Sequence, residues 1–378
     1  MAKRKVLMTG ASGYIASLML PVLRDYFDLT LADISDTDRD GNRVEGVEIA
    51  DFIDPDRSKY RHLFEGIDGV IHLAFKPHTP RGAEYENPPI DRFTNEHENV
   101  QMANNIYRSA YDAGVRRMAI ASSNHAADWY EHSLIHERKF DMVRPTDFPV
   151  SDNFYGWAKA AYELLAWPYA CGIFGRQLET VMLRIGFTRP INVEEYLSDS
   201  PMTEQTDNGI TELKRNLGAY ISPRDITQLF TKAIEAPDIG NEHGVPFVIA
   251  YGCSDNTRRF WSLETGRKYL DYQPQDDTEI IYSKEIARVL TGEGTNVRGG
   301  KVGTKIIPRR RWRLVLRERE FFAGHLVCAN FGDNLVVHIV VPFADKADSR
   351  AAFAHACGAP DPVDVLFDAL WHVIVDDM

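Results

Sequence analysis

The sequence predicts an α/β protein built on a doubly wound parallel sheet, and two observations lead to this prediction. Apolar segments of strand length alternate along the chain with segments of helical periodicity. A glycine-rich turn follows directly on the first apolar segment. Strands joined through helices form parallel sheets, which bind ligands beyond the carboxyl ends of their strands. The expected strands span 5–9, 28–32, 47–50, 69–74, 117–121 and 178–185.

Composition and charge limit the class of protein and its partners. The chain has 378 residues, of which 44% are hydrophobic and 26% are charged, enough for one sizeable core and an accessory unit. The net charge of -12 disfavours nucleic acid and anionic membranes as partners. No apolar stretch reaches the roughly 18 residues of a spanning helix, and the first strand leaves no room for a signal peptide. We therefore expect a soluble cytoplasmic protein.

Four cysteines are scattered widely, at Cys171, Cys253, Cys328 and Cys357. None forms a CxxC pair or lies at metal-binding spacing from a histidine, so we predict neither a disulfide nor a zinc site.

The first turn has the spacing Gly10-x-x-Gly13-x-x-Ala16. Glycines allow the backbone to approach a pyrophosphate closely, and the following helix directs its amino-terminal dipole at that group. The next strand ends in Asp33, whose carboxylate can accept hydrogen bonds from the adenosine ribose and would repel the extra phosphate of NADP. We predict a Rossmann-type site for NAD, in which Asp51 accepts a hydrogen bond from the adenine amino group.

Tyr155 and Lys159 lie one helical turn apart and therefore share a helix face. A tyrosine with a pKa of about 10 is a poor base at neutral pH, but a nearby ammonium stabilises its phenolate. Ser123 ends a neighbouring strand and can hold the substrate oxygen while its proton leaves. These three residues predict a hydride-transfer site.

With these motifs, residues 3–280 resemble an extended short-chain dehydrogenase/reductase of the NAD-dependent epimerase/dehydratase type. The resemblance rests also on His72-Leu73-Ala74 and on the helix motif of Asn99 and Asn105. It implies a catalytic tetrad of Asn99, Ser123, Tyr155 and Lys159, in which Asn99 supports the lysine through a water. It also implies a homodimer. The implied NAD contacts are Gly10, Ser12, Gly13, Tyr14, Ile15, Asp33, Asp51, Phe52, Leu73, Ala74, Asn99, Tyr155, Lys159 and Ile185.

Within that family, Ser122-Ser123-Asn124-His125 is similar to the run found in uronate dehydrogenases and related sugar dehydrogenases. The similarity implies substrate contacts from Asn124 and His125. It also implies that Arg215 meets a substrate carboxylate. The chain departs from these enzymes in two places, because it has Lys76-Pro77-His78 and Phe187 where they carry serines.

The segment between Ser123 and Tyr155 is long for the family and rich in aromatic and basic residues. His132 and His136 within it imitate a metal-binding pair, but the sequence offers no acidic third ligand at an obvious spacing. We predict no metal site.

We expect residues 1–284 to form one unit, with a cofactor-binding core over about 1–186 and a substrate-binding part mainly over 187–277. Residues 285–378 are predicted to form a C-terminal α+β extension, for which the sequence indicates no function. Strands are expected in it at 321–328 and 335–342, and helices at 347–356 and 363–373.

The leading hypothesis is the NAD-dependent oxidation of a sugar or sugar acid, at its anomeric hydroxyl, to a lactone. One alternative is a nucleotide-sugar epimerase, which returns the hydride and retains its NAD tightly. A second alternative is a non-catalytic protein that senses NAD.

Overall fold

The computed structural model describes residues 3–77, 92–197 and 209–290, and the backbone of 318–321, 324–331 and 335–341. The chain divides into two compact units, Met1–Thr304 and Lys305–Met378.

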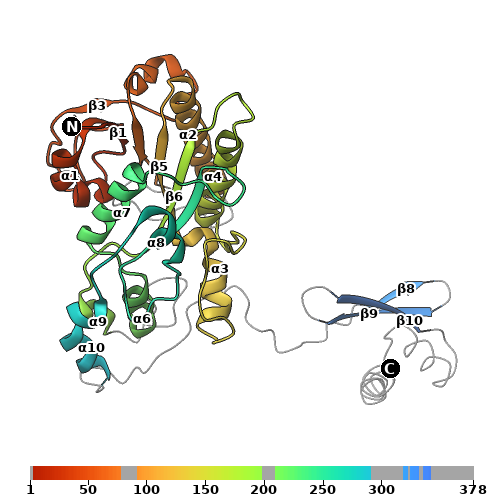
Figure 1. The fold of residues 1–378 in the computed structure, drawn as a ribbon. Coiled ribbons are helices and arrows are strands. Elements are labelled where there is room, and N and C mark those ends of the chain that lie inside the picture. Colours follow the sequence, from red (N-terminus) through yellow and green to blue (C-terminus); the bar gives the residue numbers. More distant parts are fainter. Residues whose placement is uncertain are drawn as a thin grey trace. The chain divides into compact units, whose positions relative to one another are not determined.

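The first unit is built on a seven-stranded parallel sheet with the order β3-β2-β1-β4-β5-β6-β7 (Figure 1). This order confirms the predicted fold class, and each predicted strand is present within a few residues of its expected bounds. The edge strand β7 was not predicted. The strands are β1 (Lys5–Thr9), β2 (Asp28–Asp33), β3 (Val47–Ile49), β4 (Gly69–His72), β5 (Arg117–Ser123), β6 (Glu179–Ile185) and β7 (Phe247–Gly252).

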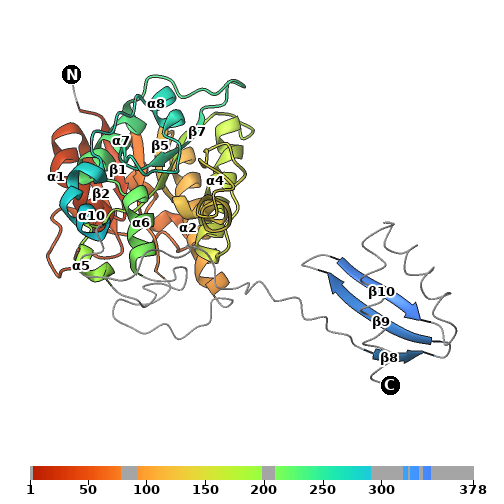
Figure 2. The ribbon, with the colours of Figure 1, turned by 90° about the horizontal axis from the view of Figure 1, so that it is seen from below.

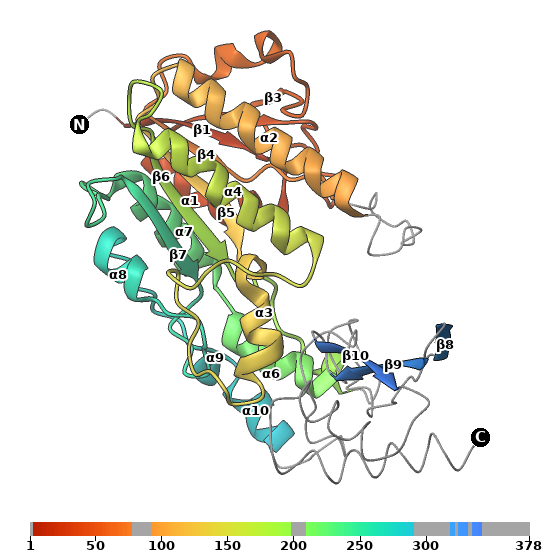
Figure 3. The same cartoon turned by 90° about the vertical axis from the view of Figure 1, so that its right-hand side faces the viewer.

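Helices cover both faces of the sheet (Figure 3). Alternate residues of a strand point to opposite faces, so Val6 and Met8 of β1 join one buried core and Leu7 joins the other. The first core is closed by α1 (Tyr14–Tyr26), α7 (Pro223–Glu235) and α8 (Glu264–Leu270). The second core is closed by α2 (Phe93–Asp112), α4 (Phe154–Cys171) and the short turn η2 (Arg61–Phe64), which follows the turn η1 (Arg57–Lys59).

The long connection from β5 to α4 folds over the carboxyl end of the sheet. It contains the 3-10 turn η4 (Asn124–Ala127), α3 (Asp128–Tyr130) and the π-helical turn η5 (Glu131–Ile135), and Figure 3 shows α3 beyond the end of β5. Val143 ties this connection to the segment after β7, because its amide donates to the Phe260 carbonyl at 2.8 Å and its carbonyl accepts from Ser262 at 2.9 Å.

A third, smaller core is formed by residues of α5 (Val193–Tyr196), α6 (Gly209–Ala219) and α10 (Ser283–Leu290). Figure 2 labels these three helices, and the short helix α9 (Thr278–Ile281) directly precedes α10. Ile286 of α10 is buried there with Leu213 and Leu217 of α6. The chain therefore contributes to the core of the first unit beyond residue 284.

The second unit contains a three-stranded antiparallel sheet in the order β10-β9-β8. Its strands are β8 (Glu318–Phe321), β9 (Gly324–Phe331) and β10 (Leu335–Val341). Where we expected one strand over 321–328, the structure has β8 ending at Phe321 and β9 beginning at Gly324. The helices expected at 347–356 and 363–373 lie outside the described residues.

The described part of the chain bears on the expectations about membrane-spanning helices and about the cysteines. None of its helices combines the length and apolar character needed to cross a membrane. Cys171 and Cys253 are free thiols, and burial raises the pKa of Cys253 to about 12. The side chains of the other two cysteines lie outside the described residues.

Candidate active site

The glycine turn after β1 requires glycine at its first position. Gly10 adopts a φ of +73°, and a Cβ there would lie 2.5–2.8 Å from the backbone of Leu73 and Ala74. Gly13 precedes α1, whose first turn has neither an acidic residue nor a side-chain cap. The free amide groups at this helix end suit an anion, so the turn fits the pyrophosphate of a dinucleotide.

Asp33 ends β2 beside this turn. Its Oδ2 accepts from the Ser12 amide at 2.9 Å and its Oδ1 from the Ile34 amide at 2.7 Å. Burial raises the pKa of Asp33, and these backbone hydrogen bonds lower it in part. The carboxylate therefore lies next to the glycine turn, where the adenosine ribose of NAD would be expected.

Asp51 and Phe52 follow β3, the next strand of the sheet. Asp51 is exposed and accepts from the Ile53 amide at 2.9 Å, so its carboxylate can reach a ligand. The Phe52 side chain is 3% exposed and packs against other aromatic rings, which leaves only its backbone for NAD. Asn105 donates to the Phe52 carbonyl at 2.9 Å and so holds this loop.

Tyr155 lies in the first turn of α4 and is hydrogen-bonded to Ser123 at the end of β5. Burial raises the pKa of Tyr155 to about 12, and the hydrogen bond from Ser123 lowers it in part. The ammonium of Lys159 lies 5.8 Å from the centre of the Tyr155 ring and donates to the Ala121 carbonyl at 3.0 Å. Burial lowers the pKa of Lys159 to about 8, and two carboxylates raise it in part.

These two carboxylates, Glu96 and Glu163, were not among the site residues predicted from the sequence. Burial raises the pKa of Glu96 to about 7, and Lys159 lowers it in part. Glu163 is buried and accepts from Ser122 at 2.8 Å and from Nη2 of Arg184 at 2.7 Å. The position of Glu163 was a usable signal, because it follows Lys159 by one helical turn.

Asn99 is fully buried on α2, but its hydrogen bonds lead to the segment after β4. Its Oδ1 accepts from the Lys76 amide at 2.8 Å and its Nδ2 donates to the Lys76 carbonyl at 3.0 Å. Asn99 therefore holds the strand-end segment next to the site. Its support of Lys159 through a water stays a prediction.

His125 lies beside Tyr155, with the two ring centroids 5.5 Å apart and the rings edge-on to each other. Its Nδ1 lies 2.8 Å from Oδ2 of the buried Asp128, which leaves Nε2 to meet a ligand. Asn153 donates to the same carboxylate at 2.8 Å and caps α4 by accepting from the Gly156 amide at 2.9 Å. One network thus orients both His125 and the helix that carries Tyr155.

Asn124 and Arg215 come together from η4 and α6. The Asn124 amide is satisfied when its nitrogen donates to the Ile185 carbonyl at 3.0 Å and its oxygen accepts from Nη2 of Arg215 at 2.8 Å. Arg215 also donates from Nε to Glu131 at 2.9 Å. The structure therefore gathers all three predicted substrate contacts, Asn124, His125 and Arg215, around the end of β5.

The structure pairs the two histidines of this connection with acids that the sequence spacing did not suggest. His132 lies with Asp128 and Asp152, and their ligand atoms are within 4.8 Å of one another. Its Nδ1 is 2.7 Å from Oδ2 of Asp152, whereas His136 faces Glu131 at 3.5 Å. Nε2 of His132 and Oδ1 of Asp128 are buried without a hydrogen-bond partner among the described residues, so the cluster is a polar group beside the site that is only partly satisfied within the protein.

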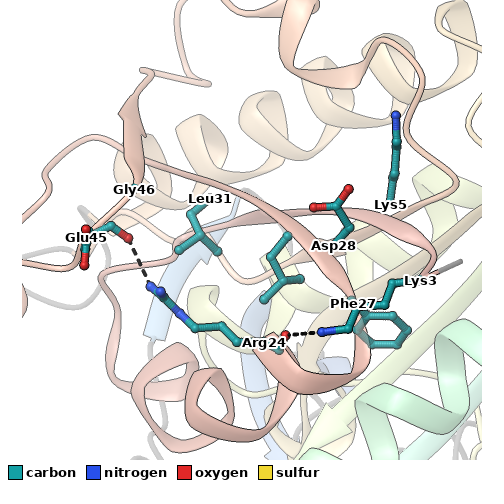
Figure 4. Close-up of a pocket in the computed structure, with 9 residues that line it drawn as sticks. Lys3, Lys5, Arg24, Phe27, Asp28, Leu31, Glu45 and Gly46 are labelled. Atoms are coloured by element: carbon teal, nitrogen blue, oxygen red, sulfur yellow. Dashed lines mark hydrogen bonds between the residues drawn. The ribbon is translucent and has the colours of Figure 1, made fainter.

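A separate hollow lies at the amino ends of β1 and β2 (Figure 4). Arg24 donates to the Glu45 carbonyl at 3.0 Å, and Lys3 donates to the Arg24 carbonyl at 2.9 Å. This hollow lies at the edge of the sheet opposite to Asp33 and Ser123, so it takes no part in the chemistry. Its lining residues are Lys3, Lys5, Arg24, Phe27, Asp28, Leu29, Leu31, Glu45 and Gly46.

The fold and the glycine turn agree with a match to a family model. Residues 6–186 match the NAD dependent epimerase/dehydratase family. A relative, the NAD-dependent glucose-6-phosphate dehydrogenase of Haloferax volcanii, is 30% identical over 72% of this chain and 94% of its own length. The chain belongs to this family. Its cofactor is accordingly NAD, which the glycine turn and Asp33 fit.

Other members of the NAD-dependent epimerase/dehydratase family are also similar. The uronate dehydrogenase of Pseudomonas syringae pv. tomato is 28% identical over 76% of this chain and 88% of its own length. The crystal structure of glucuronic acid dehydrogenase from Chromohalobacter salexigens is 25% identical, with a TM-score of 0.54 over 75% of this chain and 89% of that chain.

Replacing Asp33 with alanine should weaken NAD binding about 10–100-fold. The reason is that hydrogen bonds to a charged group contribute about 1.5–3 kcal/mol each, and about 1.4 kcal/mol corresponds to a factor of ten. Titration of NADH fluorescence measures the affinity. The control is Asp36→Ala, which removes an exposed carboxylate paired with Arg43 in the same loop. Equal affinities in the two variants would contradict the assignment of Asp33.

Proposed function

We propose that this protein is an NAD-dependent oxidoreductase that converts a sugar or sugar acid to a lactone by oxidation at the anomeric hydroxyl. The observation that carries the proposal is the half-buried Tyr155, hydrogen-bonded to Ser123 and close to the Lys159 ammonium. Asn124, His125 and Arg215 add donors and acceptors suited to a polyhydroxylated ring. The dehydrogenases of glucose 6-phosphate and uronate among the relatives support a carbohydrate substrate.

In this mechanism, Ser123 holds the substrate hydroxyl and Tyr155 removes its proton. Bound NAD supplies the acceptor for the hydride that leaves the same carbon. Because burial raises the pKa of Tyr155 to about 12, the phenolate depends on the positive charge of Lys159. Asp128 holds Nδ1 of His125, so that Nε2 is directed to the substrate hydroxyls. Each of these roles belongs to a residue near the end of β5 or on α4.

Two other functions make different predictions about the same protein. A nucleotide-sugar epimerase would use the same tetrad but return the hydride, so it would copurify with NAD and form no net NADH. A protein that only senses NAD would bind it unchanged after the substitution Tyr155→Phe and would turn over no sugar.

The test is NADH formation by purified protein with NAD and a panel of neutral aldoses, hexuronates and aldose phosphates. We expect turnover of at least one class, with a lactone as product by NMR. Absence of NADH across the panel, together with NAD bound as purified, would reject the dehydrogenase in favour of the epimerase. Absence of both NADH and epimerisation of nucleotide sugars would leave the sensing function.

A further inference from the structure

Arg215 is the residue that would decide whether the substrate is charged. It lies on α6 with 9% of its surface exposed, and it donates to the Asn124 amide oxygen at 2.8 Å. Asn124 directly follows Ser123 in the sequence. Arg215 therefore contacts the residue next to the serine whose hydroxyl would hold the substrate. A free arginine at this place would bind a carboxylate or a phosphate.

The charge of Arg215 is already compensated within the protein. Glu131 is fully buried, and its two oxygens accept from Nε of Arg215 at 2.9 Å and from Nη2 at 3.4 Å. Burial alone would raise the pKa of Glu131, but Arg215 and a hydrogen bond from His136 outweigh this effect and lower it. Glu131 is therefore a carboxylate at neutral pH, and the Arg215 guanidinium forms an ion pair with it inside the protein.

The other charges near Arg215 are paired within the protein. Burial lowers the pKa of His132, but its hydrogen bond with Asp152 and the nearby carboxylates outweigh this effect and raise it, and the ring lies 2.7 Å from that carboxylate. Arg184, the other buried arginine at this end of the sheet, is held by Glu163 through two hydrogen bonds of 2.7 and 2.8 Å. Asp128 is buried next to His125 and adds a further negative charge. A substrate anion near Arg215 would be attracted by the guanidinium and repelled by Glu131 with a similar energy. It would also pay the cost of desolvation on entering the site.

Glu131 occupies a special position in the chain. It begins the π-helical turn η5, within the connection between Ser123 and Tyr155. Single π-helical turns are frequent at functional sites because they re-aim a side chain. Here the turn carries a carboxylate to an arginine that is 84 residues away in sequence.

We infer that the site takes a neutral sugar, an aldose that presents a hydroxyl rather than a carboxylate or phosphate to Arg215, because Glu131 neutralises that arginine. This inference rests on the proposed function and specifies its substrate class. In it, Arg215 and Asn124 position the sugar through hydrogen bonds to uncharged hydroxyls. The inference sets this protein apart from the uronate dehydrogenases and the glucose-6-phosphate dehydrogenase that it resembles.

The experiment compares matched substrates: D-glucose, D-glucuronate and D-glucose 6-phosphate, and D-galactose with D-galacturonate. We expect the wild-type protein to have a kcat/KM for the neutral sugar at least about tenfold higher than for the charged partner. In Glu131→Gln the ratio should move about tenfold or more toward the uronate, because Arg215 then carries an uncompensated charge. The control Glu137→Gln removes a charge that is paired with Lys139 in the same connection, and it should leave the ratio unchanged.

Each outcome separates the inference from the proposed function. Turnover of no sugar rejects the proposed function itself. A wild-type preference for the uronate or the sugar phosphate keeps the dehydrogenase and overturns the inference. An unchanged ratio in Glu131→Gln also overturns it. If that variant does not fold, the wild-type ratio and the binding of the same sugars to the complex with NADH, measured by calorimetry, decide the question.

Discussion

Replacing Tyr155 with phenylalanine should lower kcat about 10³-fold, within the range of about 10²–10⁴ for the loss of a general base. The substitution removes only the hydroxyl, which is hydrogen-bonded to Ser123, and keeps the ring beside His125. NAD binding and thermal stability should change little. Initial rates of NADH formation and titration of NADH fluorescence measure the two effects separately.

The matched control for this substitution is Tyr162→Phe. Tyr162 lies on the same helix, is 1% exposed and has a buried hydroxyl without a hydrogen-bond partner among the described residues. Its ring lies 4.6 Å from the Lys159 ammonium, so the control keeps the same aromatic surroundings for that lysine. A kcat in Tyr155→Phe above a tenth of the control value would show that Tyr155 is not the base.

Replacing Arg184 with methionine should lower the free energy of unfolding by about 3–5 kcal/mol, because the carboxylate of Glu163 then stays buried without its ion-pair partner. Arg184 and Glu163 are both essentially inaccessible to water and share two hydrogen bonds. Arg184 also donates to the Tyr251 hydroxyl at 3.0 Å on β7. The pair therefore ties α4, which carries Tyr155, to β6 and β7. Urea denaturation followed by circular dichroism measures the loss.

An exposed ion pair provides the comparison for this substitution. Arg108 pairs with Asp112 one turn along α2, and 56% of its side chain is exposed. Arg108→Met should cost less than about 1 kcal/mol, since exposed pairs are weak. If the two variants lost similar stability, the buried pair would not brace the site.

The sequence predicted the sheet because strand and helix periodicity are local properties of the chain. Six strands were recognised from apolar runs between helical segments. The edge strand Phe247–Gly252 was missed, although it is equally apolar. Its place in the sheet depends on parallel pairing with β6, more than sixty residues earlier in the chain. The strand therefore carried the same local signal as the six that were recognised, and only its place beside β6 needed the tertiary structure.

The sequence by itself determined those parts of the site that depend on short spacings. Backbone geometry puts Tyr155 and Lys159 on one helix face and puts Gly10 in a turn that only glycine can form. Tertiary structure alone decided the partners of the buried charges. Glu131 meets Arg215 because the connection after β5 folds onto α6, and Glu163 meets Arg184 because α4 packs on the sheet. Ion pairing depends on distances in space, and packing brings together residues whose sequence separation carries no information about their contact.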